Sequence, residues 1–302
     1  MDFSEKLKNL RKEYHLSQEQ VADKIGVSRQ AITKWEIGGG LPDIENLISI
    51  AALFQISVDD LLSRETLREN ADFFIYESIT EYDIDVSKHY DFHIGDAHEI
   101  IIQGNDTEKL KVRLASKKME QLESKYKVKL DDHKNRLDLN VINNNVSKTQ
   151  TKEELCIMIY LPQKFLAGFE MAAAVSLLKI INVNAESLEF GGKVSKVQIC
   201  SFQGKLELDC SCDMEIICDH LCGQIDVNQI SAASIIHIPS GTQYHATVKG
   251  RSNRLQFTRD GKIMEPVLDA EADNGIELSG IKSELIIDEY TRLPDAARET
   301  SI

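Results

Sequence analysis

The chain has 302 residues, which is enough for two domains, and its 42% hydrophobic content argues against disorder. Its 49 acidic residues exceed its 35 basic ones, and the net charge of −14 argues against a nonspecific nucleic-acid binder. No run of eighteen apolar residues occurs, and residues 1–14 predict an amphipathic helix rather than a signal peptide, so we expect a cytoplasmic protein. The six cysteines are then expected to be reduced thiols.

The stretch after this first helix predicts two short helices joined by a tight turn. Ser17 and Ser28 each have the spacing of a helix N-cap. Gly26, between them, tolerates the positive φ angle that a tight turn needs. The helices are expected at about 18–25 and 29–37, and together they form a helix-turn-helix.

The second of these helices predicts a surface that reads DNA bases. Ile32 and Trp35 fit its buried side, which leaves four polar residues on the outer side: Arg29, Gln30, Thr33 and Lys34. Arginine reads guanine through two hydrogen bonds, glutamine reads adenine, threonine contacts a thymine methyl, and lysine reaches phosphate or guanine. A helix with these side chains exposed has what recognition in the major groove requires.

Residues 1–64 resemble the Cro/repressor-type (XRE) helix-turn-helix domain of bacterial and phage regulators. The likeness covers about a fifth of the chain and includes these residues: Trp35, Glu36, Gly38, Pro42 and the run 58–62. The resemblance implies that Gln18 contacts a DNA phosphate and that Ser28 caps the recognition helix beside the DNA backbone. It also implies that four side chains face base edges: Arg29, Gln30, Thr33 and Lys34. Many relatives carry polar or basic residues where this chain has glycine at 38–40, so this loop offers phosphate its amides but no charge.

Charge limits how the chain can bind DNA. Residues 1–65 hold eight Lys or Arg against eleven Asp or Glu, a net of −3, and the remainder holds 27 against 38, a net of −11. An acidic chain repels DNA at long range, so binding must depend on a local surface with Arg29, Lys34 and either Lys6 or Arg11. We therefore expect modest nonspecific affinity and dependence on a specific operator in double-stranded DNA.

Two further helices complete a five-helix domain over residues 1–64. A fourth helix is expected to begin at Pro42, with an apolar face made of Ile44, Leu47, Ile48 and Ala51. Ser57 and Asp60 are expected to cap a short fifth helix. Residues 65–74 are polar and highly charged, and they predict a linker.

After the linker the hydrophobic period changes to two, which predicts strands. Four alternating segments are expected strands: 99–104, 109–114, 126–130 and 136–142. Residues 116–125 fit either a short helix or a loop between strands. Residues 143–154 predict a polar loop, and 155–162 a buried strand that ends at Pro162.

The chain then repeats a pattern of short strands. Segments 185–204, 205–223 and 224–241 are similar in length, and each ends on glycine. Short repeats without helices predict a β-solenoid, while a β-sandwich or a barrel of short strands are the alternatives. This all-β repeat domain is expected over 75–290, with a C-terminal tail at 291–302. It resembles bacterial repeat-rich β domains described as candidate adhesins of unknown function, and the resemblance carries no functional residue over.

The ends of such a domain need covering. The irregular strands before the repeats are expected to cap one end. The last strand segments are expected to close the other end: 242–250, 253–261 and 275–280.

A cluster within thirteen residues raises a metal hypothesis, because thiolates and imidazole are zinc ligands. Its members are Cys210, Cys212, Cys218, His220 and Cys222. However, the cysteines share the parity of Leu206 and Leu208, and no two of them are separated by the two-residue gap typical of zinc sites. We therefore expect them to pack in the core, where free cysteine behaves as a small hydrophobic residue. No metal and no cofactor is expected.

A second loose cluster is expected to be ordinary surface residues: His89, Asp91, His93, Asp96 and His98. The Gly-Gly-Lys sequence at 191–193 lacks the spacing of a phosphate-binding loop, and neither a nucleophile-elbow nor a zinc-protease motif occurs. No catalytic residue is therefore predicted, and we do not expect an enzyme.

The leading interpretation is a sequence-specific DNA-binding transcriptional regulator, most simply a repressor. A homodimer is expected, and the β domain would dimerise the chain, sense an effector, or do both. We expect the main dimer contact in the β domain, because few apolar residues should remain exposed on the packed helical domain. The alternatives are an interaction or scaffold protein whose acidic β domain is the working part, and a metal- or thiol-responsive regulator that uses residues 210–222.

Overall fold

The computed structural model describes residues 3–13, 16–54, 61, 74–144 and 146–291. Contacts divide the chain into two units, Met1–Ala71 and Asp72–Ile302, and each is described here by itself. The expected fifth helix apart from Leu61, the linker apart from Phe74 and the tail apart from Thr291 lie outside the described residues.

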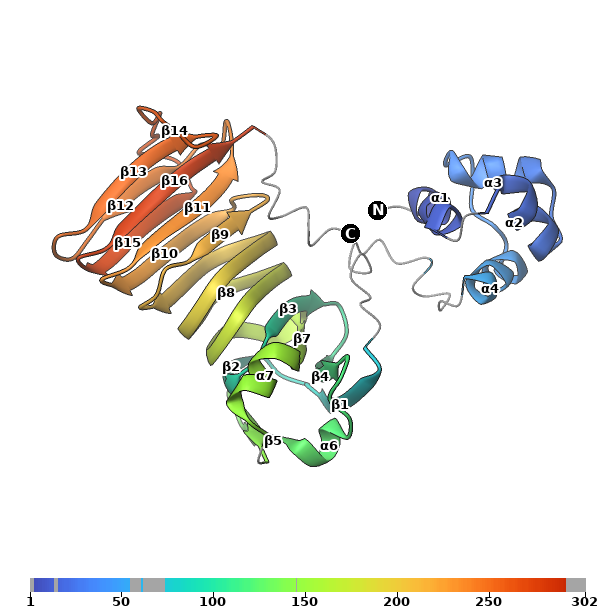
Figure 1. Ribbon diagram of the computed structural model, residues 1–302, viewed down its shortest axis with the longest axis horizontal. Coiled ribbons are helices and arrows are strands. Elements are labelled where there is room, and N and C mark those ends of the chain that lie inside the picture. The colour runs from blue at the N-terminus through green and yellow to red at the C-terminus, as the bar shows by residue number, and fades with distance from the viewer. Residues whose placement is uncertain (1–2, 14–15, 55–60, 62–73, 145, 292–302) are drawn as a thin grey trace. The chain divides into compact units, whose positions relative to one another are not determined.

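The first unit contains four helices within the described ranges: α1 (Phe3–Glu13), α2 (Gln18–Ile25), α3 (Arg29–Glu36) and α4 (Ile44–Leu53) (Figure 1). The predicted caps are confirmed. The Ser17 hydroxyl accepts the N–H of Gln20, 3.1 Å away, and that of Ser28 accepts the N–H of Ala31, 3.2 Å away. Gly26 ends α2 in the left-handed region with a φ of 77°, as the turn requires.

Helix α4 differs from its prediction in the face that it buries. Ile44 and Ile48, expected in the core, are 74% and 55% exposed. Leu47 and Ala51 of the predicted face are buried as expected, and Ile50 and the following Phe54 complete the buried face in place of Ile44 and Ile48. This set follows the same helical spacing on a neighbouring stripe of the helix, so periodicity alone could not choose between the two. The other core members of this unit are Phe3, Leu7, Val21, Ala22, Ile32, Trp35 and Leu61.

The second unit is all-β apart from short helical turns, and two hydrogen-bonded ladders of strands form it (Figure 1). Ladder A has the spatial order β5-β6-β2-β8-β10-β15-β12. Ladder B has the order β1-β4-β7-β3-β8-β9-β11-β16-β13-β14. The long strand β8 (Leu166–Cys210) contributes to both ladders. Both ladders have free ends, so the sheet is not closed into a barrel.

Strands of the first half are β1 (Tyr76–Asp83), β2 (Lys88–Asp96), β3 (Glu99–Asn105), β4 (Lys109–Ser116), β5 (Tyr126–His133), β6 (Arg136–Asn143) and β7 (Cys156–Pro162). Those after β8 are β9 (Glu215–Cys218), β10 (Gly223–Ile230), β11 (Ala233–Pro239), β12 (His245–Val248), β13 (Arg254–Arg259), β14 (Lys262–Ile263), β15 (Gly275–Ile281) and β16 (Glu284–Tyr290). Short helical turns are α6 (Leu122–Lys125), α7 (Lys148–Glu154) and η1 (Gln163–Phe165).

The structure adds helical turns and strands at three places where the prediction was incomplete. The interval 143–154 is not only a loop, because Ser147 caps α7 through the N–H of Gln150, 3.2 Å away. Residues 116–125 include the single turn α6, which resolves the alternatives left open there. Strands β1 and β2 were not predicted, although both alternate between inward and outward side chains.

Register between the parallel strands follows the predicted repeats. Gly204 pairs with Gly223 in ladder A, and Ile216 pairs with Ile236 in ladder B, so each layer of the domain corresponds to one repeat of the sequence. The two paired glycines stack at a corner where the backbone turns between ladders. Gly223 has a φ of 107°, and a Cβ atom there would lie 2.1 Å from the carbonyl oxygen of Gly204. Only glycine allows layers to approach this closely.

The order of the last three layers departs from the sequence. Strands β15 and β16 come last in the chain, yet they lie between the β10–β11 layer and the β12–β13 layer. The expectation that 275–280 closes the end of the domain is therefore wrong. The physical reason is burial, since Ile276 and Leu278 of β15 are fully buried whereas Val248 of β12 is 45% exposed. The more apolar layer lies inside and the more polar layer covers it.

The core of the second unit lies between the ladders and is continuous from Ile84 to Ile287. Ladder A contributes Leu208 and Val227, and ladder B contributes Ile216 and Ile236, all of them fully buried. Among the described residues, no helix is both long and apolar enough to span a bilayer.

Candidate DNA-binding surface

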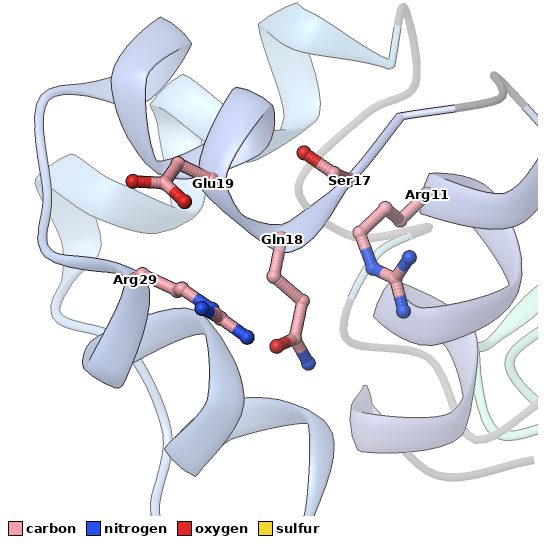
Figure 2. Close-up of a pocket in the computed structure, with 5 residues that line it drawn as sticks. All are labelled: Arg11, Ser17, Gln18, Glu19 and Arg29. Carbon is pink, nitrogen blue, oxygen red and sulfur yellow. The ribbon is translucent and has the colours of Figure 1, made fainter.

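A hollow of about 390 Å³ lies at the N-terminus of α2, lined by Arg11, Ser17, Gln18, Glu19 and Arg29. Figure 2 shows the Gln18 side chain between the guanidinium groups of Arg11 and Arg29. The first N–H groups of a helix have no partner within it and attract anions. Two arginines beside a helix N-terminus therefore form a place for an anionic oxygen such as a DNA phosphate. The Glu19 carboxylate beside the same hollow opposes that charge.

A buried network holds this surface together. Arg11 donates two hydrogen bonds to the Glu36 carboxylate, from Nε to Oε1 at 2.6 Å and from Nη2 to Oε2 at 3.0 Å. The Gln18 amide nitrogen also donates to Oε2 of Glu36, at 2.8 Å, and the Gln18 carbonyl accepts from the Thr33 hydroxyl at 3.0 Å. Gln18 thus joins α2 to α3, while Arg11 joins α1 to α3. The relative positions of the three helices are set by hydrogen bonds as well as by apolar packing.

The protonation state of Glu36 follows from these contacts. Burial by itself would raise the pKa of Glu36, but the hydrogen bonds from Arg11 and Gln18 outweigh it, and the pKa lies below its usual value. The pKa of Arg11 is raised by the same hydrogen bond. The network is therefore an ion pair at neutral pH, and part of the positive charge of Arg11 is neutralised before any DNA arrives.

The six expected site residues lie at the start of α2, at the N-cap of α3 and on α3, and their side chains differ in how tightly they are held. Arg29, Gln30 and Lys34 lie on the outer side of α3, and Ser28 is its N-cap. Thr33 is half-buried, and its hydroxyl donates to Gln18 and contacts the Arg29 carbonyl oxygen at 3.1 Å. The Thr33 hydroxyl hydrogen is therefore engaged, and its methyl group is what can contact a thymine. Gln18 is held in the network described above.

The glycine loop has a role that its composition did not reveal. Gly39 donates its N–H to the Lys34 carbonyl oxygen at 2.8 Å. A Cβ atom at residue 39 would lie 2.8 Å from Cγ of Lys34, so the lysine side chain lies directly over this glycine. The loop carries no charge of its own, but it leaves room for the Lys34 side chain at the end of α3.

Sequence reasoning missed the roles of Glu19 and Glu36. Glu36 is 25 residues from Arg11 in the chain, and no local pattern joins the two. The one available signal was that Glu36 follows Trp35 on the buried side of α3, where an acidic residue needs a partner.

The cysteine cluster divides between the core and its edge. Cys210 and Cys218 are buried among Leu, Met and Ile side chains, as predicted, and burial raises the pKa of each to about 12. Cys212 is half-buried, with its thiol 3.3 Å from the Val194 carbonyl oxygen. The alternation of buried and exposed residues ends at Ile216, because Ile217 and Cys218 are both buried, and His220 is exposed whereas Leu221 is buried.

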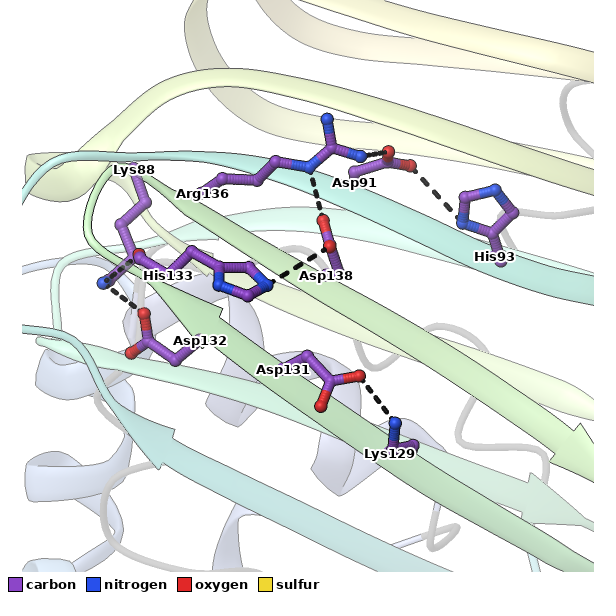
Figure 3. A network of polar contacts seen from close by, with 9 residues as sticks. All are labelled: Lys88, Asp91, His93, Lys129, Asp131, Asp132, His133, Arg136 and Asp138. Carbon is purple, nitrogen blue, oxygen red and sulfur yellow. Dashed lines mark hydrogen bonds and ion pairs between the residues drawn. The ribbon is translucent and has the colours of Figure 1, made fainter.

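Part of the histidine and aspartate cluster lies on the outer face of ladder A, where Figure 3 shows Asp91 and His93. His89, Asp91 and His93 share this face of β2, as their alternation implies. Figure 3 shows the Arg136 guanidinium between Asp91 and Asp138, with which it forms ion pairs. His89 lies 3.2 Å from the Glu170 carboxylate. These groups balance one another on the surface, and within the described residues no set of three or more His, Cys, Asp or Glu side chains could hold a metal.

Comparison with known proteins agrees with the geometry of the helical unit. Residues 7–61 match the helix-turn-helix family. The CTXphi transcriptional repressor RstR of Vibrio cholerae is 41% identical over 75 residues, which are 25% of this chain and 67% of that protein. The chain belongs to the helix-turn-helix transcriptional regulators of the XRE type. Regulators of this family bind DNA.

Other relatives share the same region only. The HTH-type transcriptional activator BcrR of Enterococcus faecalis is 49% identical over 67 residues, or 22% of this chain and 33% of that protein. This chain therefore spans a third of the length of that relative. The helix-turn-helix regulator YqaE of Bacillus subtilis is 44% identical over 64 residues, or 21% of this chain and 55% of that one.

Among solved structures, a candidate cell adhesion protein from Clostridium sporogenes covers 71% of this chain and 98% of its own, at 15% identity and a TM-score of 0.38. A transcriptional regulator from Listeria innocua covers 21% of this chain and 62% of its own, at 35% identity and a TM-score of 0.20.

Proposed function

We propose that the protein is a sequence-specific repressor whose α3 helix reads an operator in the major groove. Arg29 and Gln30 would contact base edges, Lys34 a base or phosphate, and the methyl group of Thr33 a thymine. Ser28 would hold the start of the helix beside the DNA backbone. The observation that carries the proposal is the hollow at the N-terminus of α2, which lies on the same surface as the exposed side chains of α3.

Gln18 is proposed to contact a phosphate at this hollow. Its amide nitrogen carries two hydrogens, of which one is donated to Glu36, so the second can reach a phosphate oxygen. Because a phosphate contact positions the domain without reading sequence, loss of Gln18 should weaken all DNA binding.

The repressor role rests on the simplest mechanism, in which a bound domain blocks access to the operator. The relatives include both kinds of regulator, since one is named an activator and another a repressor. The sign of regulation is therefore tested separately, by measuring transcript levels of the neighbouring genes with and without the protein.

We propose that residues 75–290 form a β-solenoid that dimerises the chain, senses an effector, or does both, that 65–74 are a linker, and that 291–302 are a tail. The parallel registers of ladders A and B, in which each layer pairs with the next one repeat along the chain, support the solenoid. We place the protein in the cytoplasm, where its operator is. The core position of Cys210 and Cys218 favours packing over a metal- or thiol-responsive role.

The experiment is capture of genomic fragments by the full chain, followed by titration of the recovered operator and its single-base variants at one fixed salt concentration. Arg29→Ala and Gln30→Ala should each cost about 1–3 kcal/mol of binding and relax preference at particular base pairs. Arg251→Ala, an exposed arginine of the second unit, is the matched control. If Arg29→Ala keeps full specificity, the assignment of α3 is wrong.

A further inference from the structure

The Lys34 side chain extends from α3 onto the glycine loop that follows the helix. A Cβ atom at Gly39 would lie 2.8 Å from Cγ of Lys34, and one at Gly40 would lie 3.7 Å from its Cε and 4.0 Å from its Nζ. The stem and the ammonium group therefore follow the loop from Gly39 to Gly40. Helical side chains usually lean toward the N-terminus of their helix, so this lysine is turned the opposite way.

Gly39 differs from its two neighbours in the reason why it is glycine. Gly38 and Gly40 have φ angles of 77° and 145°, in the region that favours glycine. The φ angle of Gly39 lies outside that region, so its backbone conformation alone would admit a side chain. Such a side chain would meet Lys34, both at Cγ and at the backbone carbonyl oxygen, which is 3.1 Å from the Cβ position. The glycine at 39 therefore makes room for the lysine.

The Lys34 ammonium group is available to DNA. Arg11 is already paired with Glu36, whereas Lys34 has no ion pair within the described part of the helical unit. When a recognition helix docks in the major groove, its N-terminal residues contact the base edges. A charge that is turned toward the C-terminal end of α3 points away from those edges and toward the phosphates that flank the groove.

We propose that Gly39 is a positioning residue that directs Lys34 to a DNA phosphate and away from base edges. The inference rests on the proposed function for the docking of α3, and it decides between the two contacts, base or phosphate, that the sequence leaves open for Lys34. With a side chain at 39, the lysine stem has to leave the loop. Its usual helical direction then places it beside Gln30, one turn earlier on the side of α3 that reads bases.

The experiment uses the full chain with Lys34→Met, with Gly39→Ala and with both substitutions. Binding is measured at several salt concentrations to a random-sequence duplex, to the recovered operator and to single-base variants of that operator. Lys24→Met removes an exposed lysine from the last turn of α2, and it is the matched control for the loss of one positive charge. Circular dichroism checks that each variant is folded.

Lys34→Met should weaken binding to every duplex by about three- to tenfold and reduce the slope of log affinity against log salt by about one. It should leave the base preference unchanged, because a phosphate contact carries no sequence information. Lys24→Met should stay within about twofold of the wild-type affinity, since salt screens a distant exposed charge.

Gly39→Ala should reduce the salt slope as Lys34→Met does, and it should also change the preference at the base pair that Gln30 reads. In the Lys34→Met background, Gly39→Ala should have no further effect, because the glycine acts through the lysine.

A changed base preference in Lys34→Met, with the salt slope unchanged, would mean that Lys34 reads a base and would overturn the proposal. An effect of Gly39→Ala that is equally large with and without Lys34 would overturn it too, since the glycine would then be structural only. If no operator is recovered, or if Arg29→Ala keeps full specificity, the proposed function fails. The salt slope on the random-sequence duplex still tests the phosphate contact of Lys34 in that case.

Discussion

At the scale of single residues, the carboxylate of Glu36 decides how the DNA-binding surface is held. It is buried, it accepts two hydrogen bonds from Arg11, and it accepts a third from Gln18. A buried carboxylate is stable only when its hydrogen-bonding capacity is filled, so the three groups depend on one another. The position of Gln18 beside the hollow at α2 is therefore a consequence of Glu36.

We predict that Glu36→Gln destabilises the helical unit by about 2 kcal/mol, because an amide replaces a charge-assisted acceptor and places its own donors against those of Arg11 or Gln18. The pKa of Glu36 is lowered in the folded chain, so its contribution is present above the usual pKa of a glutamate and is lost as pH falls through the lowered value. The variant should lack this acid-dependent loss. Thermal melts followed at 222 nm between pH 7 and pH 3 measure both effects.

Glu45→Gln is the matched control, since Glu45 is exposed on α4. It should melt almost at the temperature of the wild-type chain at neutral pH. If Glu36→Gln and Glu45→Gln have the same melting temperature and pH dependence, the Arg11–Glu36–Gln18 network does not stabilise the helical unit.

At the scale of elements, ladder A carries a row of carboxylates across its outer face. Asp138 pairs with Asp91 and Asp91 with Glu170 in register, and further along the ladder Glu207 pairs with Asp226. Several members have a cation, such as Lys205, which lies 3.0 Å from Asp226 and 3.3 Å from Glu207. Like charges side by side on adjacent strands are destabilising.

Glu189 belongs to this row, and its raised pKa reflects burial as well as the neighbouring carboxylates. Burial first, and then the carboxylates of Glu207, Glu170 and Asp209, raise its pKa. A raised acid pKa means that the folded chain holds the proton more tightly, so stability falls as pH rises from the ordinary glutamate range through the raised value. We predict that Glu189→Gln stabilises the second unit at neutral pH, by only about 0.5 kcal/mol because solvent screens an exposed side chain.

The measurement is thermal unfolding of the wild-type and Glu189→Gln chains at pH 7 and pH 4.5. The gain should shrink at the lower pH, where the wild-type carboxyl is also protonated. Glu186→Gln, on the same strand and also exposed, serves as control. A gain that is equal at both pH values would point to packing rather than charge.

The reversed order of the last layers leads to a second element-scale prediction. Gly275 of β15 pairs with Gln224 of β10 on one side and with His245 of β12 on the other. Gln224 and His245 are only about one repeat apart in the chain. The repeat alone would place β12 directly on β10. The observed insertion of β15 buries Ile276 and Leu278 completely, and leaves β12 with one paired neighbour.

We therefore predict that the amides of β15 and β16 exchange with solvent at least about tenfold more slowly than those of β12, because buried central strands open less often than edge strands. Hydrogen exchange of the full chain, read by mass spectrometry on peptides covering 245–248 and 275–290, is the measurement. Faster exchange in β15 than in β12 would mean that the layer order follows the sequence instead.

At the scale of the whole molecule, the two units have separate cores of very different size. The helical core has few members, among them Leu7, Ile32 and Trp35, whereas the core between the ladders runs through the entire second unit. Stability grows with the surface that a core buries, so the helical unit should be the weaker one.

We predict that the full chain unfolds in two transitions, the helical unit first. Scanning calorimetry should resolve two peaks, and the circular dichroism at 222 nm should follow the lower one. Ile32→Ala should shift only the lower peak, by several degrees, because it leaves a cavity in the small core. Ile236→Ala, in the large core, should shift only the upper peak. A single cooperative transition that both substitutions move would show that the units stabilise each other.

The sequence by itself determined the features that depend on neighbours along the chain. Caps at Ser17 and Ser28, the turn at Gly26 and the exposed polar residues of α3 are local, and each was predicted. The repeat of the β layers could also be predicted, because alternating apolar residues and a glycine at the corner occur in each repeat and recur in the next.

Only the tertiary structure decided what depends on contacts between distant segments. On α4, Leu47 and Ala51 were correctly predicted to be buried but Ile44 and Ile48 were not, because apolar residues lie on both sides of Leu47 and Ala51 and packing against the other helices selects the side with Ile50. The pairing of Arg11 with Glu36 spans 25 residues, and the place of β15 beside β10 joins segments that four other strands separate in the chain. In each case the free energy of burial chooses among arrangements that local patterns leave equal.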